Sequence, residues 1–600
     1  MTHSDQVDSD KLTLQHRIAM LEARLGESSS SQPSNQAGTN LEGLLVMLES
    51  LSHGKPPAPT DLSEKTTIAP LYKPGRPVFL MLIPDRTSSQ QIVNFALTNL
   101  SWIHCAIRTK VFQHEHEAFW QSIEKGNDTA SANDHGWLSV YFSLLTVGLL
   151  YMDPEERPIL HRLNGFEENA GQSDMESERG WHIARMWYEA AIKELEASNP
   201  LTKADLKTVQ TVAILTLAHS HFGQMEQEYL LLGLATNTAR ALDMHLLASE
   251  DHFSQRLASQ PNWATLENRQ LGRRLWWTLV ICDWLGMFTR PSSISPSSFN
   301  TALSPQPCDN DDLLMENVML ETTDIPALRY HLAMSKLASV IYINVKAPRD
   351  LNTDKFTVVL KHVETIEKSM ARRTITLSTN TPSWVAAQEH LIGHTIQLLS
   401  VTIARASLVL WLLGRPNTEP IIERGLKSAL KILHMRQQPV PRLYQCHWII
   451  SAATLAAGVY LAVHLICFKE ATVSTQVTER RRLIRYCISA IQYPNASTPL
   501  AIQGSQMLEI LLQIELHSPS VASTDRSTVI NLLKMAFQNE GPSIDPINEY
   551  GTMMPTALDS SADELGLLWP TMMGDFSLDE LLPNMDWGNM DGQWAGMNFD

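Results

Sequence analysis

The chain has 600 residues, with 44% hydrophobic and 18% charged residues, which is an ordinary composition for a folded protein with a sizeable core. Most of its net charge of −17 lies at one end: residues 535–600 hold twelve acidic residues and no Lys or Arg, which leaves −5 for the first 534 residues. A nearly neutral body followed by an acidic tail lacks the basic surface with which a protein binds DNA unaided.

The six cysteines lie more than ten residues apart, so the sequence has no Cys-x-x-Cys pair and no Cys/His spacing typical of a zinc site. Most of them stand in apolar runs, where a free cysteine behaves as a small hydrophobic residue. The first twelve residues are polar and acidic and contain no apolar signal region. We therefore expect a reducing, intracellular environment and no metal in this chain.

Residues 11–25 place Leu14, Ile18, Leu21 and Leu25 at steps of four, three and four. This spacing is typical of an a/d seam over two heptads, and it predicts a short coiled coil that dimerises the chain. Two heptads are marginal by themselves, and the same pattern fits a short amphipathic helix packed on the body. Both interpretations stay open from the sequence.

Residues 26–77 are predicted to be a linker, because Ser, Gln, Asn and Pro dominate it apart from a short apolar patch at 41–51. From residue 78 to 540, apolar residues recur at spacings of three and four, and alternation at period two is almost absent. This body is predicted to be all-α, a large multi-helix bundle. Asn199-Pro200, Arg290-Pro291 and Gly414-Arg415-Pro416 are expected to end helices.

Residues 448–468 are apolar over 21 positions and carry only His464 as an ionisable group. The length is sufficient to span a bilayer. No cluster of basic residues lies close to the run, and it is the one such run that the pattern singles out, so we expect a buried core helix and no membrane association.

The most informative segment is residues 271–291, LGRRLWWTLVICDWLGMFTRP, which predicts one strongly apolar helix. Trp276, Val280, Asp283 and Met287 share a face of this helix. A carboxylate on an apolar stripe needs a partner, and the nearby candidates are arginines 273, 274 and 290. The arrangement fits either a polar lock that organises the domain or a ligand pocket, or a plain structural ion pair. The proline- and serine-rich residues 289–312 that follow predict a long irregular loop.

This segment resembles the fungal-specific transcription factor domain, the middle homology region of fungal binuclear zinc cluster regulators. The residues that carry the resemblance are Arg273, Arg274, Trp276, Trp277, Asp283, Arg290, Pro291, Ile294, Pro307, Asp309 and Asp311. Residues 235–247 are similar to the Ala/Arg-rich helix that precedes the motif in that family. Thr289 departs from the pattern, because the family usually has glycine before Arg-Pro. The resemblance covers about residues 90–315 and implies a nuclear regulator of metabolic or biosynthetic genes.

The family's DNA-binding module is an N-terminal cluster of six cysteines that holds two zinc ions. This chain has no cysteine before Cys105, so the zinc ligands of the family are absent from it. Residues 11–25 look like the coiled coil that follows the cluster in the family. The resemblance therefore implies DNA binding only indirectly, through a partner regulator in a homodimer or heterodimer, or through a module that this sequence lacks.

Residues 541–600 interleave acids with large apolar side chains, a composition typical of disordered activation segments that dock on coactivators. These apolar residues are Trp569, Phe576, Leu578, Leu581, Leu582, Trp587, Trp594 and Phe599. Ser577 and Glu580 have the spacing of a capping box, and Pro583 would end the helix that they begin. A merely solubilising acidic tail is the alternative, although such a tail has no need of so many aromatic side chains.

No catalytic or metal-binding motif is present. The run His114-Glu115-His116-Glu117 lacks the second histidine of a His-Glu-x-x-His motif, and His219 and His221 do not share a helical face. The sequence thus favours a transcription regulator that dimerises and recruits coactivators, and it predicts no enzyme activity. A helical ligand-binding or scaffold protein without a role at DNA is the alternative.

Overall fold

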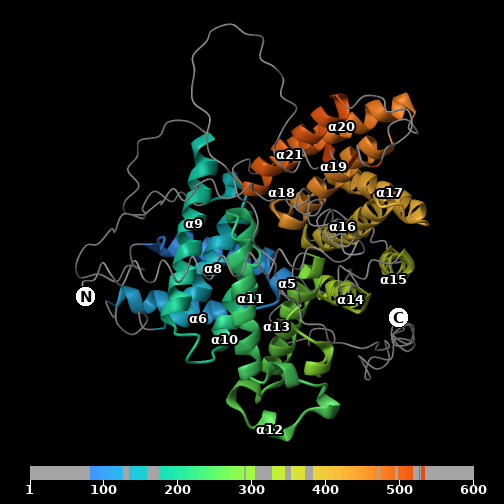
Figure 1. Ribbon diagram of the computed structural model, residues 1–600. Coiled ribbons are helices and arrows are strands. Elements are labelled where there is room, and N and C mark those ends of the chain that lie inside the picture. The colour runs from blue at the N-terminus through green and yellow to red at the C-terminus, as the bar shows by residue number, and fades with distance from the viewer. Residues whose placement is uncertain are drawn as a thin grey trace, which may run out of the picture.

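The computed structural model describes residues 82–125, 134–157, 174–288, 292–303, 328–344, 353–371, 383–438, 440–468, 473–493 and 498–517, and five positions between 526 and 533. The described residues form helices and connecting segments and contain no strand, so the all-α prediction is confirmed. The predicted coiled coil, the linker and the acidic tail lie outside the described residues. Figure 1 shows that the helices of the first half gather below and to the left of those of the second half.

The first half of the body is built around one hydrophobic core. Short polar residues start its helices: Asp85, Asp134 and Asp205 each accept a hydrogen bond from a backbone N–H in the first turn of the helix that follows. The α-helices of this half are α4 (Arg86–Asn99), α5 (Ser101–His104), α6 (Thr109–Glu124), α8 (His135–Tyr151), α9 (Asp174–Ala197), α10 (Leu206–Leu215), α11 (Met225–Ala241), α12 (Gln255–Ala258) and α13 (Leu266–Leu285).

The centre of this core is α8, whose residues from Gly136 to Tyr151 are all buried. A helix that is apolar on every face has to be surrounded, and α8 is packed against α4, α9 and α10. Around its first turns, the rings of Phe112, Phe119 and Tyr141 pack against Trp137 with centroids 4.7–5.6 Å apart. Aromatic packing of this kind anchors α6 to α8.

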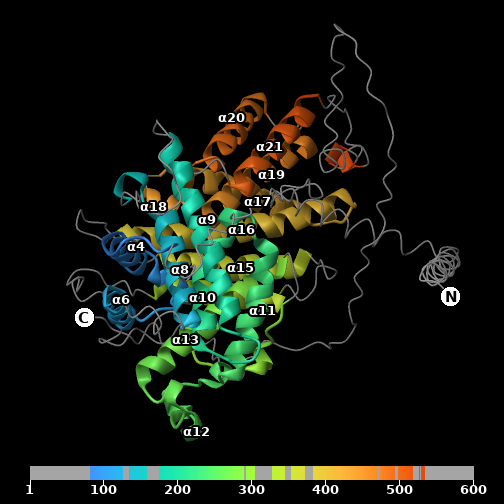
Figure 2. The ribbon, with the colours of Figure 1, turned by 90° about the vertical axis from the view of Figure 1, so that its left-hand side faces the viewer.

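The second half has its own hydrophobic core. Its helices are α14 (Arg329–Asn344), α15 (Thr353–Ala371), α16 (Ser383–Leu412), α17 (Glu419–Arg436), α18 (Arg442–Gln445), α19 (Trp448–Phe468), α20 (Ser474–Ile491) and α21 (Pro499–His517). Figure 2 shows α19, α20 and α21 at the upper end of the body. Ala338, Ala387 and Leu391 belong to the first core although they lie on α14 and α16. These two helices therefore connect the two cores.

The apolar helix α19 packs against α16, α17, α20 and α21, and 89% of its most apolar window is buried. The prediction of a buried core helix at residues 448–468 is confirmed. The expectation of a single such run was wrong, because residues Trp384–Leu412 of α16 have a comparable hydropathy and are buried to the same extent. The sequence pattern did not indicate that this helix is as apolar as α19, because Gln, Glu and His residues are spread along its first turns.

Two of the three predicted helix ends are confirmed. The last residue of α9 is Ala197, and Asn199 then adopts a positive φ of 55°; the last residue of α16 is Leu412, and Gly414 has φ 79°. A left-handed residue just after a helix is the usual way to turn the chain away from its axis. Arg290 and Pro291 lie outside the described residues.

Candidate functional site

The motif helix α13 is the element that the sequence singled out, and it begins earlier and ends earlier than predicted. Thr265 caps it by accepting a hydrogen bond from the backbone N–H of Asn268 at 3.3 Å, and Leu285 is its last residue. Residues 270–280 are buried on all sides of the helix. Because Arg273 and Arg274 fall within this stretch, both guanidinium groups have to find partners inside the protein.

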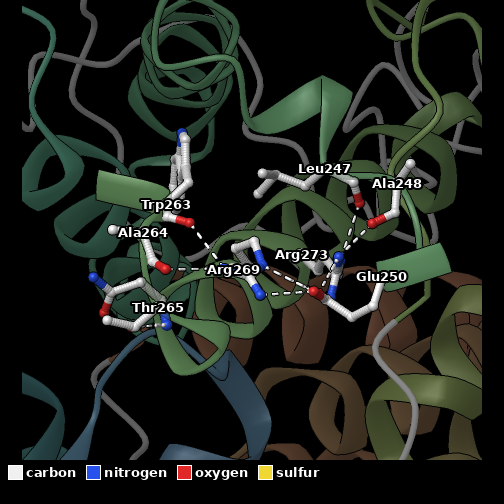
Figure 3. Close-up of polar contacts among 9 residues, drawn as sticks. Leu247, Ala248, Glu250, Trp263, Ala264, Thr265, Arg269 and Arg273 are labelled. Carbon is white, nitrogen blue, oxygen red and sulfur yellow. Dashed lines mark hydrogen bonds and ion pairs between the residues drawn. The ribbon is translucent and has the colours of Figure 1, made fainter. Parts of the chain in front are cut away.

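Arg273 is bound by the segment that precedes the helix, as Figure 3 shows. Its Nε donates to the backbone carbonyl of Leu247 at 3.0 Å, and one terminal nitrogen donates to the carbonyl of Ala248. The same nitrogen lies 2.7 Å from Oε1 of Glu250. The Arg273 side chain is 2% exposed and the Glu250 side chain is 42% exposed, so the pair connects the interior to the surface.

Arg269, one turn earlier on α13, binds the other side of the same carboxylate (Figure 3). Its guanidinium donates to Glu250 at 2.7–3.2 Å and to the carbonyls of Trp263 and Ala264 at 3.1 and 3.2 Å. Burial raises the pKa of Glu250, but hydrogen bonds from the two arginines outweigh it and hold the pKa below its ordinary value. We call Glu250, Arg269 and Arg273 the α13 clamp. It fixes the connection between α11 and α13.

Gly272 allows this connection to approach the helix closely. A Cβ atom at this position would lie 2.5 Å from Cδ1 of Leu247 and 2.6 Å from the ring of Trp263. Trp263 is fully buried, and its Nε1 donates to the carbonyl of Leu242 at 2.8 Å. The ring is thus held in place against the bare backbone of α13.

The opposite side of α13 is fixed to α14 and to the end of α5 through Thr278. The Thr278 hydroxyl lies 3.2 Å from Nε2 of His331 on α14, 3.2 Å from the carbonyl of His104, and 3.0 Å from the carbonyl of Arg274. Burial lowers the pKa of His331 to about 4, assisted by the charge of Arg274, and burial alone lowers the pKa of His104 to about 3. Both imidazoles are neutral at pH 7.

The tryptophans of the motif are core residues that hold the following segment. Trp276 and Trp277 are almost completely buried and pack on Phe299 with ring centroids 5.5 and 5.7 Å apart. Nε1 of Trp277 donates to the carbonyl of Thr301 at 3.2 Å, and Nε1 of Trp284 donates to the carbonyl of Ile294 at 2.8 Å. Residues 292–303 are therefore fastened along the helix although they contain only the short helical turn η7 (Pro296–Ser298).

Asp283 has partners other than the arginines that the sequence named as candidates. Its carboxylate accepts from the backbone N–H groups of Ser293 and Ile294 at 2.9–3.0 Å and from the hydroxyls of Ser292 and Ser293 at 2.6 and 3.0 Å. Of the three candidate partners, Arg273 and Arg274 are excluded, because nine or ten residues of helix separate them from Asp283 by about 14–15 Å. Arg290 lies outside the described residues. Asp283 and Met287 are only half-buried, so the face that they share with Trp276 and Val280 is less buried at this end of the motif.

The chemistry of this site is that of a structural junction. The arginines of the α13 clamp donate to backbone carbonyls and one carboxylate, and Asp283 accepts from one turn of chain. Among the described residues, no group of three His, Cys, Asp or Glu side chains could hold a metal ion. Of the histidines in the His-Glu-His-Glu run, His116 is buried and its Nε2 lies 2.8 Å from the Ser89 hydroxyl.

The sequence did not reveal Glu250, Arg269, Gly272 or Phe299 as parts of this site. Arg269 carried a usable signal, since it lies four residues before Arg273 and thus on the same face of the helix. Glu250 carried none, because it stands in a polar loop 23 residues away from Arg273.

A family model that describes Cep3, a component of the centromere DNA-binding protein complex CBF3, matches residues 79–304. The agnestins biosynthesis cluster transcription factor of Paecilomyces divaricatus is 30% identical over 211 residues, which are 35% of this chain and 28% of the relative. The matched part thus spans less than a third of that relative. The solved structure of the K. lactis CBF3 core is similar in fold, with a TM-score of 0.57 and 13% identity over 84% of this chain and 97% of that chain.

The matched residues 79–304 include most of the first core and contain the whole of the α13 clamp together with the segment fastened by Trp277, Trp284 and Asp283. The chain therefore carries a fungal transcription factor-like domain. The structural similarity to the CBF3 core covers 84% of this chain, so it extends beyond the matched residues into the second half.

Proposed function

We propose that this protein regulates transcription of a metabolic or secondary-metabolite biosynthetic gene set in a fungal nucleus. The observation that carries the proposal is the agreement between the sequence match to a biosynthesis-cluster transcription factor and the built junction around α13. The helical body is the regulatory domain, and no residue in it is assigned a catalytic role.

Two segments outside the described residues supply the remaining functions. Leu14, Ile18, Leu21 and Leu25 form a dimerisation seam, either with a second copy or with a DNA-binding regulator. The acidic tail recruits coactivators through the aromatic and leucine side chains between Trp569 and Phe599, because repulsion among its acids keeps those side chains available. DNA is contacted through the partner or through a separate zinc cluster module, and this chain contributes no cofactor.

The tail is tested by fusing residues 541–600 to an unrelated DNA-binding domain and measuring a reporter gene. We expect activation, and we expect replacement of Phe576, Leu581 and Trp587 by alanine to abolish it. The matched control replaces Asp559, Asp563 and Asp586 by asparagine, which lowers the charge but keeps the apolar side chains. Activity that survives the alanine variant would contradict coactivator docking by these residues.

A second function is favoured by the family model, whose description is that of a component of a DNA-binding complex. In that case the body acts as a scaffold in such a complex, and the tail is inert. The two functions differ in the reporter experiment. If the protein is a scaffold with an inert tail, the DNA-binding domain leaves the reporter silent whether or not residues 541–600 are fused to it.

A further inference from the structure

The outward face of α11 carries an unusual set of side chains for a surface helix. Met225, Tyr229 and Leu230 are exposed by 46%, 38% and 71%, and a Cβ atom added to Gly233 would meet no other atom within 4 Å. Exposed apolar side chains that cluster on one helix are typical of an interaction site. Figure 1 places α11 at the front of the body, and Figure 2 places it on the right-hand side of the first half.

The charges on this face are arranged symmetrically about the glycine. Glu226 lies seven residues before Gly233 and Arg240 lies seven residues after it. Seven residues are close to two helical turns, so the three residues share one stripe, with each charge about 10 Å from the glycine along the axis. Glu226 has no hydrogen bond or ion pair among the described residues.

Arg240 keeps donors free for a partner. It donates to the side chain of Asn237 at 3.4 Å and to the carbonyl of Ser293 at 3.2 Å, and both bonds are exposed. A guanidinium has five N–H groups, so these two contacts leave donors for a carboxylate. The bond to Ser293 also ties this face of α11 to the segment that Asp283 holds.

We propose that the α11 face, made of Met225, Glu226, Tyr229, Leu230, Gly233 and Arg240, binds the same face of a second copy of this chain. In an antiparallel pair with the twofold axis at Gly233, Glu226 of each copy lies opposite Arg240 of the other, and Tyr229 lies opposite Asn237. The contact is isologous, since the same surface of each copy contacts its equivalent on the other. The absence of a side chain at Gly233 lets the helices approach at the near-antiparallel crossing of about 20° that helix pairs favour.

This contact is weak by itself, because two single helices bury less than the roughly 1,200–2,000 Å² of a stable interface. Here the inference rests on the proposed dimerisation through residues 11–25, which raises the local concentration of one α11 face near the other. The two contacts together define a dimer in which the bodies are held in one orientation, rather than tethered loosely.

The test uses the full chain with Gly233→Cys, because position 233 meets its own copy on the twofold axis. We expect mild oxidation to link two copies at least about tenfold faster than in the Leu201→Cys control, whose site is 88% exposed on the loop between α9 and α10. The five described native cysteines are buried or half-buried, so the unmodified chain sets the background. An equal rate for the two cysteine variants would overturn the proposal.

Charge reversal tests the symmetry. In the Gly233→Cys chain, we expect either Glu226→Arg or Arg240→Glu to slow linking about tenfold, because each brings like charges together twice. Mixing these two variants restores opposite charges at both positions and is expected to restore the rate. Circular dichroism checks that each variant is folded. If reversal has no effect, or if mixing fails to rescue, the antiparallel arrangement is wrong.

A second series adds Leu14→Asp and Leu21→Asp to both cysteine variants. If the coiled coil exists, linking slows in both, while the advantage of position 233 remains. If these changes alter nothing, the proposed coiled coil fails and the α11 contact stands, so the two failures are distinguishable.

Discussion

Replacing Arg273 is expected to destabilise the first core far more than replacing Glu250, although the two side chains form one ion pair. The difference follows from their exposure, 2% for the Arg273 side chain and 42% for that of Glu250. Arg273 also donates to the carbonyls of Leu247 and Ala248, so its replacement removes these two hydrogen bonds as well. Glu250 is partly hydrated and keeps Arg269 as a second partner.

The magnitude can be worked out from these contacts. Arg273→Met removes donors from two buried carbonyls, and each buried acceptor left short of a partner costs about 1–3 kcal/mol. The carbonyl of Leu247 still accepts from the N–H of Ala302 at 3.1 Å, so its loss is at the lower end. We therefore expect Arg273→Met to lower the free energy of unfolding by about 3 kcal/mol. Glu250→Gln keeps an acceptor for the arginines and removes the charge of a side chain that is half-exposed, so we expect a loss of about 0–1 kcal/mol.

Thermal unfolding followed by tryptophan fluorescence measures the difference, because Trp263, Trp276 and Trp277 lie beside the α13 clamp. For a unit of 150–250 residues, about 3 kcal/mol corresponds to a fall in Tm of roughly 6–12 °C, and 1 kcal/mol to about 2–4 °C. Arg256→Met is the matched control, since Arg256 forms an exposed pair with Asp243 at 3.4 Å. Equal losses for Arg273→Met and Glu250→Gln would refute the reasoning.

Three further predictions concern the same region. Gly272→Ala is expected to lower the free energy of unfolding by about 1–3 kcal/mol, because the added methyl overlaps the fixed ring of Trp263; a variant as stable as the parent in thermal melts would contradict this packing. Asp283→Ala is expected to release residues 292–294, which limited proteolysis between α13 and α14 would detect as faster cleavage. The control Asp251→Ala, at an exposed position between α11 and α13, is expected to leave that cleavage rate unchanged. Acid is expected to unfold the body. Burial holds the pKa of eight described histidines at about 3 or 4, whereas the ordinary pKa of a histidine is about 6.5. Below pH 6.5 the unfolded chain therefore binds more protons than the folded chain. Stability is fully present above about pH 6.5 and is lost as the pH falls toward 4, by about 1.4 kcal/mol per pH unit for each histidine, and a Tm that is flat between pH 6.5 and 5 would exclude this. These are His104, His116, His221, His331, His390, His394, His447 and His464.

The sequence was sufficient for the features that depend on local pattern. The burial of α19 follows from a run of 21 residues with one ionisable group, and the end of α9 follows from Asn199-Pro200. The identity of α13 as the helix that organises its surroundings also follows from its pattern, because paired tryptophans and paired arginines inside an apolar run require burial and partners.

The partners themselves could not be predicted, because they are set by chain reversals. Asp283 binds residues nine to eleven positions later, where the chain turns back along the helix, and Glu250 reaches Arg273 from a loop that folds over an earlier turn. Helical periodicity determines which side of α13 a residue occupies, but it contains no information on which loop covers that side. The exposed stripe on α11 was invisible for a related reason: only the packing of the other helices determines which apolar residues remain outside.

The geometry also explains why a match limited to residues 79–304 is informative about the whole body. Thr278 on α13 contacts His331 on α14 directly. Because α14 contributes to both cores, the position of the second core depends on contacts made within the first. We therefore expect a change at α13 to alter the second half through these packed side chains and hydrogen bonds. A regulatory domain requires this kind of coupling if an event on one half is to alter the other.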